Sequence, residues 1–330
     1  MSENVTRLAP SPTGALHLGN ARSFIINWAM ARQRGWKIAL RIDDLDSPRV
    51  KRGADQQAID DLRWLGIDWD SGPTYQLTEL PRYQAALRQL AGRGLIYPCR
   101  CTRGEIAAAQ SAPHGDEHEL RYPGTCRPVE NRVSEDAADK EAGRDEHFFD
   151  FKLPGAWRVI VPDERIMFDD IFHGRVETNV QQVVGDFVVA TKQGLPAYQL
   201  AVVIDDATAG VTQVVRGDDL LGSTARQLLL YRLLELSPTP AYCHLPLVIG
   251  EDGRRLAKRH GDTRLSYYRQ LGVPPERILG LLAGWSMPMA ERRPMSAAMF
   301  GERFDLSKLP REPVIFTATD DQWLRKGATR

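Results

Sequence analysis

The sequence predicts an α/β protein built on a parallel sheet. A first strand is expected at residues 5–9, where a short apolar run fits a buried strand. Apolar residues then recur at helical spacing over residues 17–34, and Gly35 offers a helix stop. Residues 36–42 form the second expected strand. A strand, a helix and a strand in this order make a βαβ unit, which favours a parallel sheet with nucleotide at the carboxyl ends of its strands.

The remaining elements follow from the same periodicities. Helices are expected at residues 53–65, 80–93, 223–236, 265–271 and 275–285, and strands at residues 183–190, 198–204 and 212–215. Between them, residues 97–146 are irregular and include an acidic stretch at 135–146, to which no function is given. We therefore predict the first half of the main α/β domain (1–96), an insertion (97–180), the second half of that domain (181–260) and a short helical C-terminal extension (261–330).

Composition limits the class of protein. With 330 residues and 42% hydrophobic content, the chain can bury one large core or a main domain with a smaller insertion. Lysine plus arginine and aspartate plus glutamate both number 43, so RNA contact would have to come from local patches. No apolar run approaches the roughly 18 residues of a membrane span, and the N-terminus does not resemble a signal peptide. A cytoplasmic protein, without membrane contact and monomeric, is expected.

Two loops far apart in the sequence have the character of a phosphate-binding site. Residues 7–20 read RLAPSPTGALHLGN, a turn-rich loop that runs into a helix, and residues 255–259 read RLAKR. A helix N-terminus directs backbone N–H groups and a positive dipole end at phosphate. Gly19 would let a nucleotide approach, and His17 could donate to a phosphate oxygen or simply cap the helix. Lys258 could supply a mobile positive charge, or be a solvated surface lysine.

Together with residues 41–49, RIDDLDSPR, these segments resemble the class I glutamyl-tRNA synthetases over roughly residues 4–270. HLGN is similar to the family's HIGH signature, and RLAKR is similar to a variant of its KMSKS loop. The resemblance implies the class I form of the Rossmann fold and activation of L-glutamate to glutamyl-adenylate with ATP and Mg²⁺. It implies catalytic roles for His17 and Lys258, and an ATP site made by His17, Gly19, Asn20, Arg255 and Lys258.

The second loop departs from the family pattern at two positions. Arg255 replaces its first lysine and Ala257 replaces its serine. Arginine keeps the charge, whereas loss of the hydroxyl removes one hydrogen bond with a net value on the order of 1 kcal/mol. We expect at most a modest effect on activity.

Glutamate carries two carboxylates and one ammonium, so a selective site should offer two cations and one anion. Arg7, Arg216 and Asp43 supply that set. Which arginine takes the side-chain carboxylate is left open, and Arg216 could instead pair with Asp218 or Asp219. The resemblance places the following residues around the amino acid: Arg7, Ala9, Ser11, Asp43, Tyr198 and Arg216.

Asp43 is itself a departure, because the family usually has glutamate at this position. If the shorter side chain meets the substrate ammonium, either the backbone moves closer or a water bridges the gap. The alternative is that Asp43 belongs to the following turn and pairs with Arg41 or Arg49.

Three of the four cysteines fall within 28 positions, a grouping more typical of metal ligation than of a disulfide framework in a cytosolic chain. Cys99, Cys101 and Cys126 could bind one structural Zn²⁺ or remain three reduced thiols. The resemblance favours Tyr122 as fourth ligand, and His114 and His118 are alternatives. Cys243 stands apart and is interpreted as a small core residue.

The chain after the second loop is too short for a large second domain, whereas ordinary family members continue into a helical anticodon-binding portion. This layout, with Cys-x-Cys early in the insertion, resembles a shortened paralogue of the family that attaches glutamate to the queuosine base at the wobble position of tRNA(Asp). Two alternatives stay open. One is a shortened synthetase charging tRNA(Glu), and the other is a non-catalytic tRNA-binding paralogue.

Overall fold

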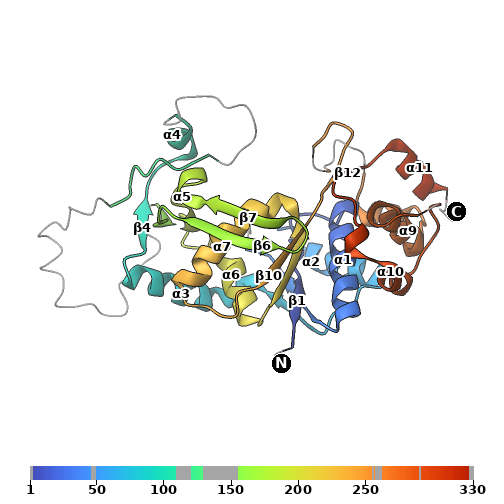
Figure 1. The fold of residues 1–330 in the computed structure, drawn as a ribbon, viewed down its shortest axis with the longest axis horizontal. Helices are drawn as coiled ribbons and strands as arrows, with labels where there is room; N and C mark the ends of the chain where they lie inside the picture. Colours follow the sequence, from blue (N-terminus) through green and yellow to red (C-terminus); the bar gives the residue numbers. More distant parts are fainter. Residues whose placement is uncertain are drawn as a thin grey trace, which may run out of the picture.

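The computed structural model describes residues 3–45, 50–108, 120–128, 155–254, 256, 262–289 and 291–326. Its main parallel strands are β1 (Val5–Leu8), β2 (Lys37–Ile42), β3 (Ser71–Tyr75), β9 (Gln213–Gly217) and β10 (Ala241–Leu245). β2 pairs in parallel with β1 and β3, and β9 pairs in parallel with β10. Thr212 N–H donates to the Val5 carbonyl at 2.9 Å, which places β9 beside β1. The expected parallel sheet is confirmed (Figure 1).

Helix α1 (Leu18–Arg34) links β1 to β2 and forms much of the core. It ends at Gly35, whose φ of 66° is the left-handed conformation that glycine adopts at low cost. Arg32 and Arg34 in its last turn complement the helix dipole. Ile25 and Ile26 are fully buried. The helix is therefore fixed along its length, which gives its N-terminus a defined position.

Four other helices, from residues 1–96 and 181–260, flank the sheet. They are α2 (Ala54–Trp64), α3 (Leu80–Gly92), α6 (Tyr198–Thr208) and α7 (Leu221–Leu233). The strand expected at residues 198–204 is wrong, because this segment is the start of α6. Its run of Leu, Ala, Val and Ile is buried on nearly every side, and such a run has no periodicity that separates a buried helix from a buried strand.

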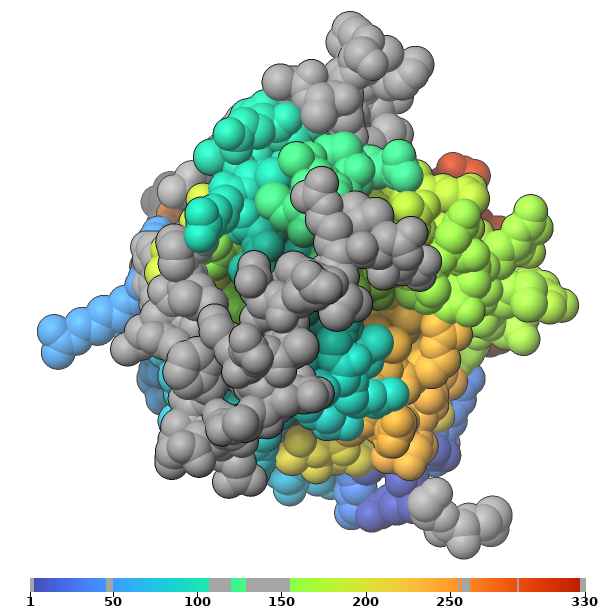
Figure 2. All heavy atoms as spheres, turned by 90° about the vertical axis from the view of Figure 1, so that its left-hand side faces the viewer, coloured from blue at the N-terminus to red at the C-terminus, as the bar shows by residue number. Residues whose placement is uncertain are grey.

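An antiparallel sheet of β4 (Ile96–Cys99), β5 (Ala156–Val159) and β8 (Val188–Ala190) lies at one end of the molecule. The strand expected at residues 183–190 covers only β8, because α5 (Val180–Val183) precedes it. Helix α4 (Arg103–Ala108) and residues 120–128 lie at the same end of the molecule, which faces the viewer in Figure 2. The acidic stretch at 135–146 is outside the described residues.

A hairpin of β6 (Arg165–Asp170) and β7 (Gly174–Asn179) joins this end to the main sheet, although the sequence did not predict it. The end of β6 pairs in parallel with β10, where Tyr242 lies opposite Asp170. Figure 1 shows the hairpin crossing the front of the molecule toward α1. The turn of the hairpin therefore reaches the central strands.

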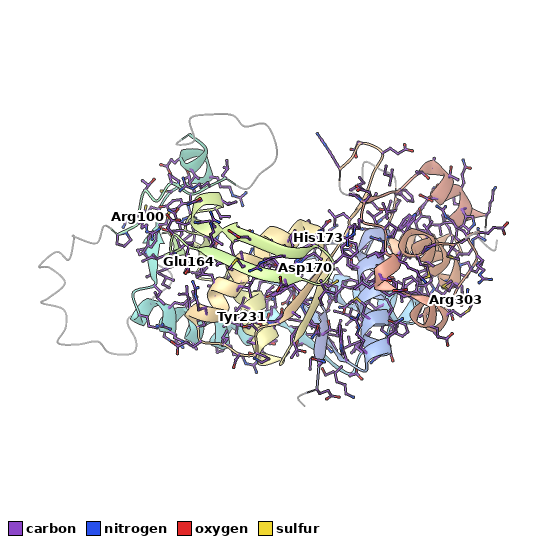
Figure 3. All side chains as sticks on the ribbon, viewed as in Figure 1. Arg100, Glu164, Asp170, His173, Tyr231 and Arg303 are labelled. Atoms are coloured by element: carbon purple, nitrogen blue, oxygen red, sulfur yellow. The ribbon has the colours of Figure 1, made fainter. Side chains whose placement is uncertain are left out.

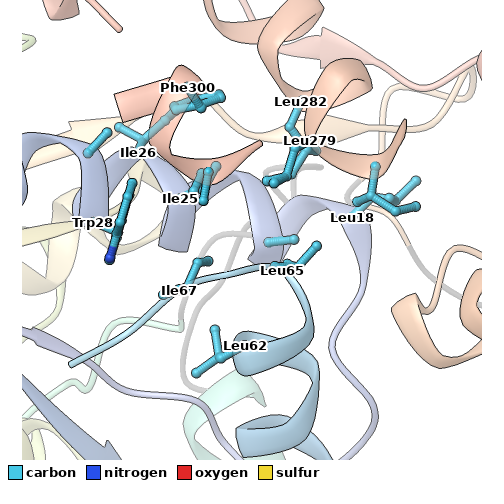
Figure 4. Packing of buried hydrophobic residues seen from close by; sticks show 14 of the residues in the cluster. Leu18, Ile25, Ile26, Trp28, Leu62, Leu65, Ile67, Leu279, Leu282 and Phe300 are labelled. Carbon is cyan, nitrogen blue, oxygen red and sulfur yellow. The ribbon is translucent and has the colours of Figure 1, made fainter. Parts of the chain in front are cut away.

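The C-terminal extension packs on α1. It contains α8 (Leu265–Gln270), α9 (Pro275–Ser286), α10 (Ala297–Arg303) and α11 (Ala318–Arg325), with β11 (Val248–Ile249) pairing β12 (Val314–Ile315). Leu279, Leu282 and Phe300 gather around the apolar face of α1 (Figure 4). Gln33 in α1 donates to the carbonyls of Gly301 and Phe304 at 2.6 and 2.7 Å. Among the described helices, none has both the length and the apolar character needed to cross a membrane.

Candidate active site

A pocket of about 500 Å³ lies at the carboxyl ends of β1, β2 and β9. Strand order reverses between β1 and β9, and this switch point is where doubly wound sheets bind ligands. The structure thus brings segments from both halves of the chain into one cavity. The pocket is lined by all the described residues that the sequence analysis predicted to bind glutamate or ATP. These are Arg7, Ala9, Ser11, His17, Gly19, Asn20, Asp43, Tyr198 and Arg216.

His17 caps α1 with its side chain. The imidazole Nδ1 accepts from the N–H groups of Gly19 at 3.1 Å and Asn20 at 3.4 Å, and Asn20 Oδ1 accepts from the His17 N–H at 3.3 Å. A Cβ at position 19 would lie 3.1 Å from the ring, so glycine makes room for it. The expectation that these N–H groups face a phosphate is corrected, because the ring already binds them. With Nδ1 as acceptor, the neutral ring carries its proton on Nε2.

Leu256 in the second basic loop, residues 255–259, and the chain after that loop are hydrogen-bonded next to the start of α1. Arg255 and Lys258 themselves lie outside the described residues. Leu256 is buried, and its N–H faces the carbonyl of Val248, which lines the pocket, at 3.5 Å. After the loop, the Thr263 carbonyl accepts from the Leu18 N–H at 3.0 Å. The chain on either side of residues 257–261 is therefore tied to the pocket and to the residue that follows His17.

A buried network of arginines and aspartates forms the floor of the pocket. Asp206 bridges two guanidinium groups, with Oδ2 at 3.3 Å from Arg7 Nε and Oδ1 at 2.6 Å from Arg41 Nη1. Burial alone would raise the pKa of Asp206, but Arg7 and Arg41 hold it below the usual value. Arg41 also donates to Asp43 through Nε at 2.6 Å and Nη2 at 3.4 Å. The alternative pairing of Asp43 with Arg41 is thus present, while Asp43 still lines the pocket.

Sequence reasoning named Arg41 only as a possible partner of Asp43, and it missed the link from Arg41 to Asp205 and Asp206. Asp205 accepts from Tyr83 Oη at 2.6 Å and Gln76 Nε2 at 2.7 Å, and lies 3.6 Å from Arg41 Nε. The signal was available, because an arginine and two adjacent aspartates inside otherwise apolar segments are costly to bury unless they pair. Their partners lie more than 120 positions away, so only the fold reveals the pairing.

Arg216 differs from the other two arginines. It makes no ion pair with a carboxylate in the part of the chain that the structure describes, and the alternative pairing with Asp218 or Asp219 is not observed. Nη2 donates to Thr224 Oγ1 at 2.8 Å and to the Leu220 carbonyl at 3.3 Å, and Nε donates to a histidine. Nη1 is buried without a hydrogen-bond partner among the described residues. Arg216 therefore offers an uncompensated positive charge to the pocket.

A second cluster lies in the insertion, where three cysteines meet. The Sγ atoms of Cys99, Cys101 and Cys126 lie within 4.8 Å of one another. Tyr122 Oη is 3.4 Å from Cys99 Sγ and 4.0 Å from Cys101 Sγ, and it accepts from the Cys126 N–H at 2.8 Å. His114 and His118 are outside the described residues. Cys243 lies apart, fully buried in β10, as predicted.

The cluster has the dimensions of a tetrahedral metal site. Zn–S bonds of about 2.3 Å separate two sulfur ligands by roughly 3.8 Å, and a sulfur from an oxygen ligand by roughly 3.5 Å. The observed 3.6 Å between Cys101 and Cys126 and 3.4 Å between Cys99 and Tyr122 fit those values. Burial alone would raise the pKa of Cys126, but hydrogen bonds from the Arg100 backbone and Tyr122 lower it to about 7, which favours the thiolate that a metal requires.

Known proteins share both the sequence and the fold. Residues 3–323 match the family of tRNA synthetases class I (E and Q), catalytic domain. The chain is 46% identical to a glutamyl-Q tRNA(Asp) synthetase of Rhodopirellula baltica over 97% of its own length and all of that relative. It is 45% identical to another from Symbiobacterium thermophilum, covering 94% of this chain and 95% of the relative.

A solved glutamate tRNA ligase from Elizabethkingia meningosepticum, in complex with its amino acid, has the same fold, with a TM-score of 0.78 and 26% identity. The match covers 98% of this chain but 69% of that ligase. By contrast, the relatives from R. baltica and S. thermophilum are matched along nearly their whole length. The chain belongs to the class I tRNA synthetases (E and Q) and, within them, to the family of the glutamyl-Q tRNA(Asp) synthetases.

Proposed function

We propose that this protein activates L-glutamate with ATP and transfers the glutamyl group to the queuosine base at the wobble position of tRNA(Asp). The observation that carries the proposal is that one pocket contains both His17, which caps α1, and the buried arginines and aspartates. Membership of the glutamyl-Q tRNA(Asp) synthetases supports the choice of acceptor.

In the first step, a carboxylate oxygen of glutamate attacks the α-phosphorus of ATP. A new P–O bond forms, the bond to the β-phosphate bridging oxygen breaks, and pyrophosphate leaves. Charge grows on the phosphate oxygens, so donors already in position lower the barrier. We assign this task to His17 through Nε2–H, because Nδ1 is committed to the helix cap. Gly19 and Asn20 shape the adjacent wall of the ATP site.

The charges of the pocket suggest how glutamate lies in it. Within the described part of the chain, no group accepts from the buried Nη1 of Arg216, so we assign this guanidinium to one substrate carboxylate. Arg7 uses Nε and Nη1 for Asp206 and the Val215 carbonyl, and its remaining edge is assigned to the other carboxylate. Asp43 is assigned to the ammonium, held in place by Arg41. The wall residues Ala9, Ser11 and Tyr198 complete the amino-acid site.

Lys258 and Arg255 are assigned to the departing pyrophosphate of ATP, which enters with Mg²⁺. Support comes from the ends of their loop, which are fastened to Val248 and Leu18 beside the pocket. A compact ammonium on a flexible stem suits a charge that develops only in the transition state. In the second step a ring hydroxyl of queuosine attacks the glutamyl carbonyl, and AMP leaves.

We propose that Cys99, Cys101, Cys126 and Tyr122 hold one structural Zn²⁺. The sulfur and oxygen separations support this ligand set, and four protein ligands leave no position for chemistry. The metal would fix the insertion on the face where the tRNA substrate approaches. We retain the division into catalytic halves (1–96, 181–260), insertion (97–180) and extension (261–330) as part of this proposal.

Exchange of labelled pyrophosphate into ATP tests the activation step. Glutamate should support exchange, whereas aspartate and glutamine should support little, since each lacks either the length or the second carboxylate. Exchange without tRNA would show that the pocket is complete in the free protein. Failure of glutamate to support exchange, both with and without tRNA, would favour the non-catalytic tRNA-binding alternative.

A parallel incubation tests the acceptor. Labelled glutamate should become attached to tRNA(Asp) and not to tRNA(Glu). Preferential labelling of tRNA(Glu) would instead identify a shortened synthetase of the glutamate tRNA ligase type, whose catalytic fold the chain shares.

A further inference from the structure

His244 connects the uncompensated arginine of the pocket to a buried carboxylate behind it. It lies in β10, is 0% exposed and is absent from the pocket lining. Its Nε2 is 3.0 Å from Arg216 Nε, and its Nδ1 is 2.7 Å from Asp170 Oδ2. Asp170 ends β6, at the turn of the hairpin, beside His173 (Figure 3). Asp170, His244 and Arg216 therefore form a buried hydrogen-bonded chain from the hairpin to the pocket.

The hydrogen bonds settle the form of the imidazole. A guanidinium can only donate, so His244 Nε2 must be an acceptor and the ring proton must be on Nδ1, where it donates to Asp170. Burial, then Arg216, lowers the pKa of His244 although Asp170 opposes the shift. The ring is therefore neutral at neutral pH. A protonated ring would point an N–H at the guanidinium.

Asp170 is held rigidly. Besides the imidazole, its carboxylate accepts from the N–H groups of Phe172 and His173, both at 2.9 Å, and of His244 at 3.1 Å. A ring stack also fixes His244, since the Tyr242 ring lies parallel to it within 7° at a centroid distance of 6.1 Å. The imidazole consequently has little freedom to turn away from Arg216.

We infer that Asp170 and His244 are positioning residues, which hold the Arg216 guanidinium so that its Nη1 faces a carboxylate of glutamate. The inference rests on the proposed glutamate site. A neutral acceptor orients a guanidinium without cancelling its charge, whereas Arg7 and Arg41 are held by carboxylates that do cancel it. Because His244 is neutral, the positive charge of Arg216 remains available to an anionic substrate.

Two substitutions separate orientation from simple packing. In His244→Gln the side-chain oxygen can take the place of Nε2 and accept from Arg216. In His244→Asn the amide can take the place of Nδ1 and donate to Asp170, but no group replaces Nε2 as the acceptor for Arg216 Nε. A matched control is His173→Asn, because His173 is exposed and meets Asp170 only through its backbone N–H.

Glutamate binding by calorimetry and pyrophosphate exchange should be measured for all four proteins. We expect His244→Asn to weaken glutamate binding roughly 10- to 100-fold with the KM for ATP nearly unchanged. His244→Gln should stay within about 3-fold of the parent, and His173→Asn should match it. Unchanged glutamate binding in His244→Asn, or equal loss of glutamate and ATP affinity in both His244 variants, would overturn the inference.

The two readouts keep the inference distinct from the proposed function. A parent protein that binds glutamate but catalyses no exchange would contradict activation, while weakened binding in His244→Asn alone would still support positioning. A parent protein that fails to bind glutamate would overturn both.

Discussion

Individual charged side chains in the pocket differ in how completely the protein itself pairs them. Arg7 and Arg41 are joined by the bridging carboxylate of Asp206, whereas Arg216 is held by a histidine, a threonine and a carbonyl. A buried ion pair stabilises little, but removing one partner leaves an uncompensated charge. Arg7 and Arg41 are therefore sensitive to loss of Asp206. Arg216, which has no carboxylate partner among the described residues, is suited to bind a substrate.

Asp206→Asn tests this difference. Two buried guanidinium groups would lose a shared carboxylate, so the free energy of unfolding should fall by about 3 kcal/mol and glutamate binding should weaken. Urea denaturation measures the first effect. In the control Asp68→Asn, the lost partner of Arg32 is 72% exposed, and the cost should stay below about 1 kcal/mol. Equal costs for the two variants would argue against a special role for the buried network.

Asp61 in α2 presents the opposite case, a buried carboxylate without a hydrogen-bond partner in the described part of the chain. It is 0% exposed, and neither oxygen has a hydrogen-bond partner among the described residues. Burial raises its pKa to about 6, with Arg269 opposing the shift only in part. Since the folded state holds this proton more tightly than the unfolded chain, the carboxyl should lower stability as pH rises from about 4 to 6.

Asp61→Asn should remove that loss. We expect the variant to match the parent near pH 4 and to be more stable by about 2 to 3 kcal/mol at pH 8, because two pKa units separate the folded and unfolded groups. Thermal melts across this pH range measure the effect. Asp60→Asn removes an exposed neighbouring charge that contributes less than burial to the raised pKa of Asp61, so it should shift the pH profile only slightly. A variant less stable than the parent at pH 8 would show that the ionised Asp61 is stabilised in the fold.

The secondary-structure elements show which parts of the site sequence reasoning can reach. Helix α1 was predicted because its apolar periodicity ends at Gly35. Helix α6 was mistaken for a strand because its apolar run is buried almost all round, and β10 was missed, although it carries His244. The residues that line the pocket were found from motifs. Asp206 and Asp170, which support these residues, were not found, because their contacts join elements distant in sequence.

The cysteine cluster that we propose as a zinc site lies where β4 and the segment 120–128 meet, so the proposal can be tested by replacing one ligand. Cys126→Ser should lose stoichiometric zinc, since a serine hydroxyl replaces a thiolate whose pKa is about 7. Cys243→Ser removes a cysteine buried elsewhere and should retain one zinc per chain. Elemental analysis of both purified variants decides this. A parent protein that contains no zinc when prepared without chelator would contradict the assignment.

In the whole molecule, the insertion and the C-terminal extension lie at opposite ends of the catalytic sheet (Figure 1). The extension packs on α1, whose N-cap is His17, and the insertion carries the cysteine cluster. Arg22 joins α1 to the extension, with Nε donating to Ser286 Oγ at 3.2 Å and Nη2 donating to the Trp285 carbonyl at 3.3 Å. The extension therefore stabilises the helix on which the active site depends.

Phe300→Ala tests that dependence. Phe300 is fully buried between α10 and α1, so its truncation should cost about 3 to 5 kcal/mol in the free energy of unfolding. Pyrophosphate exchange should fall with the folded fraction as the temperature rises. Ile315→Ala, at a side chain 51% exposed, should change stability by less than about 0.5 kcal/mol. A Phe300→Ala protein as stable as the parent would contradict the structural role of the extension.

The measurement that tests the proposed function most directly is the position of glutamate on the tRNA. Labelled glutamate, ATP and the protein would be incubated with tRNA(Asp) that carries queuosine, and with the same tRNA lacking it, followed by nuclease digestion. We predict label only on the fragment that contains queuosine, and none on the unmodified tRNA. Label at the 3′ end, or equal labelling of both tRNAs, would contradict the proposed function.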